Sequence, residues 1–88
     1  MRNEVVITGA GSGLGQALTE KFSKEGSKVH LIGRTLAKLK ATAKKLNNPF
    51  EIHQVDIRSK SEVEEVFSQI KNIDILINNA GLGRFGKA

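Results

Sequence analysis

The chain lacks cysteine, tryptophan and tyrosine, and it has a single proline among its 88 residues. Without cysteine it forms neither a disulfide nor a thiolate metal site. It has no apolar run long enough to cross a bilayer and no visible signal peptide, so we expect a cytoplasmic protein without a membrane partner. The length allows one small domain at most, over residues 1–88.

Acidic residues are absent between Gly26 and Phe50, although the whole chain carries a net charge of +5. Six cations lie in that segment: Lys28, Arg34, Lys38, Lys40, Lys44 and Lys45. Such a segment attracts polyphosphates. The four aromatic residues are all phenylalanine and do not alternate with basic residues as in stacking surfaces for bases, so we do not expect nucleic acid as a partner.

Hydrophobic periodicity switches regularly between strand and helix along the chain. Strands are predicted over residues 5–8, 29–32, 50–55 and 73–77. The side chains expected to pack inward from the intervening helices are Leu14, Ala17, Leu18 and Phe22, then Leu36, Leu39, Ala43 and Leu46, then Val63, Val66, Phe67 and Ile70. Thr35 is the expected cap of the second helix, and either Ser59 or Ser61 caps the third. This alternation predicts an α/β fold with a parallel sheet in strand order 3-2-1-4.

A glycine-rich turn joins the first strand to the first helix. Its residues are Thr8, Gly9, Ala10, Gly11, Ser12, Gly13, Leu14 and Gly15. A helix N-terminus offers unpaired N–H groups and partial positive charge, and glycines let a pyrophosphate approach the backbone. The spacing T-G-x-x-x-G-x-G therefore indicates a dinucleotide site. A phosphate loop ending in G-K-[ST] is excluded, because Gln16 and Ala17 occupy the required positions.

The end of the second strand indicates which dinucleotide is preferred. Gly33, Arg34 and Thr35 stand where an acidic residue would bind the adenosine ribose 2′-OH and repel a 2′-phosphate. Arginine binds a phosphate through two hydrogen bonds, and Ser12 can add a hydroxyl. We therefore expect NADP(H). The alternative interpretation of Arg34 is an exposed loop residue.

Two further segments complete a resemblance to the short-chain dehydrogenases/reductases. Asp56 and Ile57 follow the third strand, and Asn78-Asn79-Ala80-Gly81 follows the fourth. The resemblance implies the N-terminal half of a Rossmann-type doubly wound sheet. It also implies that Asp56 and Ile57 hold adenine, and that Asn79, Ala80 and Gly81 line the ribose.

The catalytic residues of that family have no counterpart here. The family uses a tyrosine, a lysine four residues later and an upstream serine, whereas this chain contains no tyrosine. We therefore expect a truncated N-terminal part of an NADP(H)-dependent oxidoreductase, which transfers hydride between nicotinamide and a carbonyl or alcohol. The 88 residues alone are expected to be inactive. A non-catalytic NADP(H)-binding module remains the alternative, and a basic nucleic-acid-binding protein ranks last.

Two more expectations concern assembly and metals. The fourth strand is an apolar edge in a 3-2-1-4 sheet, and such an edge favours pairing. It predicts a homo-oligomer that forms through this strand and the uncovered sheet face. His30 and His53 are the only histidines, and without further ligands at suitable spacing they predict no metal site.

Overall fold

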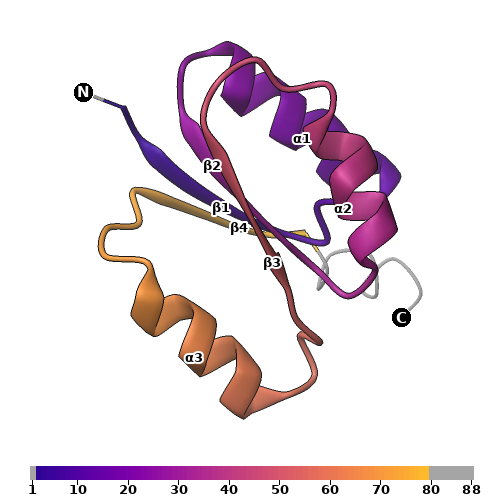
Figure 1. The fold of residues 1–88 in the computed structure, drawn as a ribbon. Coiled ribbons are helices and arrows are strands. Elements are labelled where there is room, and N and C mark those ends of the chain that lie inside the picture. Colours follow the sequence, from indigo (N-terminus) through magenta and orange to yellow (C-terminus); the bar gives the residue numbers. More distant parts are fainter. Residues whose placement is uncertain (1, 80–88) are drawn as a thin grey trace.

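A computed structural model describes residues 2–79 of the chain. Its elements are β1 (Glu4–Thr8), α1 (Gly13–Lys24), β2 (Lys28–Gly33), α2 (Leu36–Ala43), β3 (Phe50–Gln54), α3 (Lys60–Gln69) and β4 (Ile75–Asn78). Within this part of the chain the strands form one parallel sheet in the order β3-β2-β1-β4 (Figure 1). The structure thus confirms the predicted fold class and strand order.

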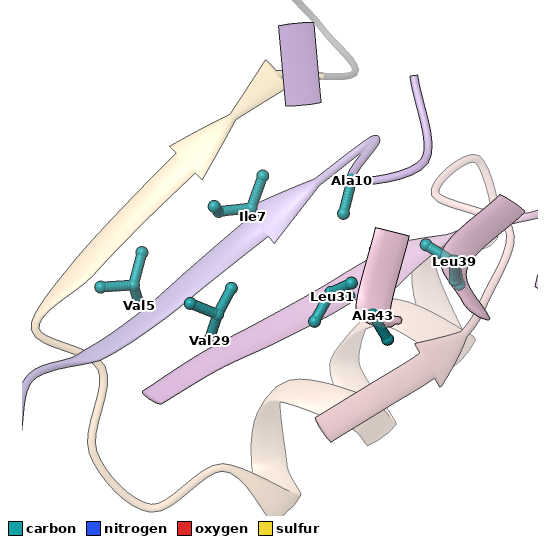
Figure 2. Packing of buried hydrophobic residues seen from close by; sticks show 7 residues of the cluster. All are labelled: Val5, Ile7, Ala10, Val29, Leu31, Leu39 and Ala43. Carbon is teal, nitrogen blue, oxygen red and sulfur yellow. The ribbon is translucent and has the colours of Figure 1, made fainter. Parts of the chain in front are cut away.

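The two faces of the sheet pack against different helices, with α1 and α2 on one side and α3 on the other (Figure 1). This follows from the alternation of side chains along each strand. The first face holds the larger buried cluster, which consists of Val5, Ile7, Ala10, Val29, Leu31, Leu39 and Ala43 (Figure 2). The cluster beneath α3 is smaller and consists of Val6, Ile32, Val55 and Ile70.

The buried stripe of α1 differs from the predicted one. Leu14 is 58% exposed and Ala17 is also exposed, whereas the fully buried positions are Gly15, Thr19 and Ser23. The physical reason is the short distance between the start of α1 and the glycine turn, which admits only small side chains against the sheet. The predicted Leu18 and Phe22 do pack against the larger cluster, and both are partly buried.

The helix caps resolve the choice that the sequence left open. Ser59 precedes α3, and its hydroxyl oxygen accepts a hydrogen bond of 3.4 Å from the Glu62 N–H. Thr35 occupies the predicted cap position of α2 but makes no side-chain capping bond. No residue within α3 is fully buried, and only Ile70, directly after the helix, is. The helix therefore packs less deeply on the sheet than its apolar pattern predicts.

The strand β4 lies at an edge of the sheet, as predicted, but it starts two residues later than expected. Before it, Asp74 N–H donates to the Glu4 carbonyl at 2.9 Å, and Glu4 N–H donates to Asp74 Oδ2 at 2.7 Å. These bonds fix the entry into the strand. Leu76 is half exposed on the α3 side of this edge. None of the helices within residues 2–79 has the length and hydrophobicity to cross a bilayer.

Candidate cofactor-binding site

A cleft of about 220 Å³ opens at the carboxyl ends of the central strands. Its lining comes from the end of β2 and from the loops that follow β1, β2 and β3: Gly9, Ile32, Gly33, Arg34, Val55, Asp56, Ile57 and Arg58. Open parallel sheets bind ligands at this edge. The structure therefore brings together four residues that the sequence marked from separate motifs, namely Gly9, Arg34, Asp56 and Ile57.

The glycine turn has a backbone conformation and a close packing that residues with a side chain would not allow. Gly9 has a φ of +67°, in the left-handed region that favours glycine. A Cβ atom on Gly15 would collide with the Gly9 carbonyl and would lie 2.8 Å from Asn79 Nδ2. Gly15 therefore allows the first turn of α1 to approach β1 closely, which is one of the roles of glycine in dinucleotide turns.

Polar side chains hold the turn in place from within. The buried Asn79 donates through Nδ2 to the Gly9 carbonyl and to Ser12 Oγ, at 3.1 Å each. Ser12 Oγ in turn donates to the Gly9 carbonyl at 2.8 Å. The Ser12 hydroxyl proton is thus used inside the turn, and a hydrogen bond from Ser12 to a phosphate requires this bond to break.

The N-terminus of α1 is suited to a pyrophosphate. Within residues 2–79, no side chain caps this helix, and its first turn has no acidic residue. A Cβ on Gly13, the first helical residue, would meet nothing within 4 Å. The N–H groups of the first turn and the helix dipole therefore face open space without a competing carboxylate, so the residues present fit an anionic ligand.

Arg34 follows β2 and is exposed beside the cleft. It forms no ion pair with any residue in the described part of the chain, while its carbonyl accepts a hydrogen bond of 3.2 Å from Gln54 Nε2. Its guanidinium therefore carries a charge that no acidic side chain neutralises by direct contact. Thr35, also exposed, lies next to it but does not line the cleft.

The acid that lines the same cleft, Asp56, is already paired. Arg58 donates from Nε to Asp56 Oδ1 at 3.1 Å and from a terminal guanidinium nitrogen to Oδ2 at 3.0 Å. Its backbone N–H also donates to Oδ1 at 2.9 Å. The Arg58 side chain, followed by its backbone N–H, lowers the pKa of Asp56 to about 2. Because Arg58 balances this carboxylate, Asp56 adds no unpaired negative charge to the cleft.

Arg58 itself is a site residue that the sequence analysis missed. The spacing of Asp56 and Arg58, two residues apart after a strand, was the available signal. An Asp side chain in a turn commonly accepts from the N–H two residues on. The next residue, Ile57, is 40% exposed and lines the same cleft. It supplies an apolar surface of the kind that a planar base needs.

Other predicted site residues lie next to the cleft but outside its lining. Thr8 Oγ1 donates to Asn78 Oδ1 at 3.2 Å and so joins β1 to β4. A Cβ on Gly11 would lie 2.8 Å from Lys38 Cβ, so Gly11 permits close packing on α2. Leu14 projects into solvent. The predicted residues Ala80 and Gly81 lie outside the described part of the chain.

The structure also brings together a cluster that the sequence analysis did not find. His30, Glu51 and His53 present donor atoms that lie within 4.8 Å of one another. The two histidines therefore have a neighbouring carboxylate that their spacing in the sequence did not indicate. The missed signal was the parallel register, which pairs His30 with Glu51, together with the same-face spacing of Glu51 and His53.

Fold and site together define an α/β protein with a glycine-turn site for a dinucleotide at the carboxyl edge of its sheet. Comparison with known protein families identifies a narrower class, because residues 3–88 match the short chain dehydrogenase family. The chain belongs to this family, which confirms the resemblance seen in its motifs.

Two curated relatives illustrate the similarity. An NADP-dependent 3-hydroxy acid dehydrogenase YdfG of Shigella flexneri is 38% identical over 82 residues, which cover 89% of this chain and 33% of that protein. A serine 3-dehydrogenase of Agrobacterium fabrum is 41% identical over 86 residues, covering 93% of this chain and 34% of that protein. The chain thus spans about a third of the length of the relatives it matches.

Solved structures agree with the fold. A short chain dehydrogenase from Bacillus anthracis superposes with a TM-score of 0.78 at 33% identity, over 84% of this chain and 34% of that one. A closed form of serine dehydrogenase complexed with NADP⁺ gives a TM-score of 0.75 at 34% identity, over 83% of this chain and 31% of that one.

Proposed function

We propose that this chain is the cofactor-binding part of an NADP(H)-dependent oxidoreductase. The observation that carries the proposal is Arg34, an exposed cation without an ion-pair partner in residues 2–79, at the end of β2 where an acid would select NAD(H). The two relatives whose names or titles specify NADP, the 3-hydroxy acid dehydrogenase and the serine dehydrogenase complex, support the same cofactor.

In this proposal, different residues contact different parts of the adenosine half of the cofactor. The open N-terminus of α1 at Gly13 receives the pyrophosphate through backbone N–H groups. Arg34 binds the 2′-phosphate through its guanidinium, because a planar fork of donors matches phosphate oxygens. Ile57 packs against adenine, and Asp56 at its edge stays ionised through Arg58. Asn79 keeps the turn in shape, and with Ala80 and Gly81 it lies beside the ribose in this proposal.

The nicotinamide of the bound cofactor supplies the hydride chemistry, and we propose a carbonyl or alcohol as the substrate class. The 88 residues contain no tyrosine, so the proton donor that the family uses is not among them. We infer that they are inactive by themselves. A non-catalytic NADP(H)-binding module is the second candidate, because it would use the same glycine turn and Arg34 and would need no tyrosine.

Location and assembly remain predictions. We expect the protein in the cytoplasm, and we expect self-association through β4 and the sheet face beside it. The half-exposed Leu76 on this edge strand supports the second expectation, because an exposed apolar edge is a pairing surface.

The Arg34→Asp substitution tests the cofactor assignment. We expect the affinity for NADPH to fall about 10- to 100-fold, since a hydrogen bond to a charged group contributes about 1.5–3 kcal/mol. The affinity for NADH should change less than about threefold. Equilibrium titrations of both dinucleotides, followed by the fluorescence of the reduced nicotinamide, measure the two affinities.

The matched control is Lys24→Asp, which makes the same change of charge on an exposed position near the far end of α1. It should leave both affinities close to those of the unmodified protein. Equal weakening of NADPH and NADH by Arg34→Asp would contradict the 2′-phosphate role, as would equal effects of the two substitutions.

A further inference from the structure

A second group of polar side chains lies on the α3 face of the sheet, along the adjacent strands β2 and β3. His30 comes from β2, and Glu51 and His53 come from the adjacent edge strand β3. His30 is 3% exposed at its side chain and His53 is 13% exposed. Buried imidazoles of this kind need a polar partner. None of the three residues lines the cofactor cleft.

The three donor atoms form a nearly equilateral triangle. His30 Nδ1 lies 3.5 Å from His53 Nε2 and 3.8 Å from Glu51 Oε1, and His53 Nε2 lies 3.5 Å from the same carboxylate oxygen. The point equidistant from all three lies about 2.1 Å from each, which is the bond length of zinc to imidazole nitrogen and carboxylate oxygen.

From this geometry we infer that His30 Nδ1, His53 Nε2 and Glu51 Oε1 bind a divalent transition metal ion, with Zn²⁺ the best match. Two imidazoles and a carboxylate are zinc ligands, whereas calcium and magnesium take oxygen ligands. Three protein ligands leave a coordination position open for water. The ion joins the edge strand β3 to the central strand β2.

Neighbouring side chains orient the ligands as they do around known metal centres. Glu4 Oε1 lies 2.7 Å from His30 Nε2, so this nitrogen carries the proton and donates to the carboxylate. The tautomer leaves the lone pair on His30 Nδ1, the nitrogen that faces the cluster. A metal-binding histidine almost always has such a carboxylate, carbonyl or water partner on its other nitrogen.

Lys28 orients the carboxylate ligand, Glu51, in the same way as Glu4 orients His30. Its Nζ donates to Glu51 Oε2 at 2.7 Å and leaves Oε1 for the metal. This contact is the largest of the causes that lower the pKa of Glu51, so the carboxylate is ionised at neutral pH. Burial, followed by the nearby His30, lowers the pKa of His53, and a neutral imidazole has the lone pair that a metal needs.

An ion can reach the cluster from solvent. The side chain of Glu51 is 48% exposed, and a cleft beside it is lined by Glu4, Lys28, His30, Glu51, Gln69, Ile70, Lys71 and Asn72. Without an ion, His30 Nδ1 and His53 Nε2 have only long contacts, of 3.5 Å to each other and of 3.8 and 3.5 Å to Glu51 Oε1. A bound cation replaces these long contacts by coordinate bonds.

Metal binding is tested by isothermal titration of Zn²⁺ into the full-length protein, purified without a histidine tag and stripped with a chelator. The unmodified protein should bind one equivalent at this site. Glu51→Gln and His53→Gln should each weaken that binding at least tenfold, on the order of the loss seen even for outer partners of metal ligands. Glu20→Gln is the matched control, because Glu20 is a half-buried acid on α1 with a lysine partner, Lys45.

Two further measurements keep the outcome decisive. Thermal unfolding in the presence of chelator shows whether each variant still folds, and Glu51→Gln is the safer variant because its side chain is half exposed. Long-range ¹H–¹⁵N spectra should show that zinc shifts His30 Nδ1 and His53 Nε2, not the other ring nitrogens. The inference is overturned if the protein binds no zinc, or if folded Glu51→Gln and His53→Gln variants bind it as tightly as the control.

Discussion

The cofactor cleft at the carboxyl edge of the sheet and the histidine cluster on its α3 face are built from different parts of the chain. At the carboxyl end, the glycine turn and the start of α1 offer backbone N–H groups, and the glycines keep side chains out of the way. On the α3 face, side chains from three strands converge, with Glu4 and His30 in contact and Glu51 and His53 beside them. The first site depends on local sequence, and the second depends on strand register.

The two sites also differ in which partners satisfy their polar groups. The helix N-terminus leaves its donors facing open space, where a ligand or water satisfies them. In the histidine cluster His30 is buried and His53 is partly buried, so they depend on Glu4, on Glu51 and on each other. A change at one site should therefore leave the binding properties of the other site intact.

The largest expected effect is that of Gly15→Ala. The new Cβ would collide with the Gly9 carbonyl, which is backbone and cannot rotate away. We expect a loss of about 3 kcal/mol in the free energy of unfolding, the upper end of the range for overpacking. Chemical denaturation measures it. A variant as stable as the unmodified protein would show that the turn is not as tightly packed as the structure indicates.

The matched substitution Gly13→Ala separates packing from binding. Because its Cβ would meet nothing within 4 Å, the stability should stay constant or rise by less than about 1 kcal/mol, through higher helix propensity. The affinity for NADPH should nevertheless fall, since the methyl group enters the space proposed for the pyrophosphate. Zinc affinity at the histidine cluster should not change. Unaltered NADPH binding would remove Gly13 from the pyrophosphate site.

The smallest effect concerns the pH dependence of Asp56. Its pKa is lowered from 3.8 to about 2, so pairing with Arg58 contributes stability that is present above pH 3.8 and is lost as the pH falls toward 2. Carboxyl ¹³C shifts should show Asp56 almost fully ionised at pH 4. In Arg58→Gln the pKa should return toward 3.8. Titration of Asp56 near 3.8 in the unmodified protein would rule out the paired geometry.

The sequence predicted the features that local patterns encode. The strand order followed from alternating strands and helices, and the cleft residues Arg34, Asp56 and Ile57 followed from their positions directly after strands. One observation was enough to predict Arg34 as a site residue, namely a cation at the end of β2, where dinucleotide folds usually have an acid. The carboxyl ends of parallel strands lie together, so motifs far apart in sequence predicted one site.

What the sequence did not predict depends on contacts between elements. The buried face of α1 is set by how closely Gly15 approaches Gly9, so Leu14 is exposed although its spacing fits an apolar stripe. The pairing of Asp56 with Arg58 depends on a turn conformation. The His30 and Glu51 contact depends on the register of β2 and β3, which a one-residue shift would abolish.

The central claim, that the carboxyl edge selects a 2′-phosphorylated adenosine, is tested most directly by a pair of small ligands. Adenosine 2′,5′-bisphosphate and adenosine 5′-monophosphate differ only in the 2′-phosphate, and neither needs the nicotinamide half of the site. Calorimetry should show at least about tenfold tighter binding of the bisphosphate, since a charge-assisted bond contributes about 1.5 kcal/mol or more. Equal affinities for the two ligands would contradict the assignment of Arg34 and with it the proposed preference for NADP(H).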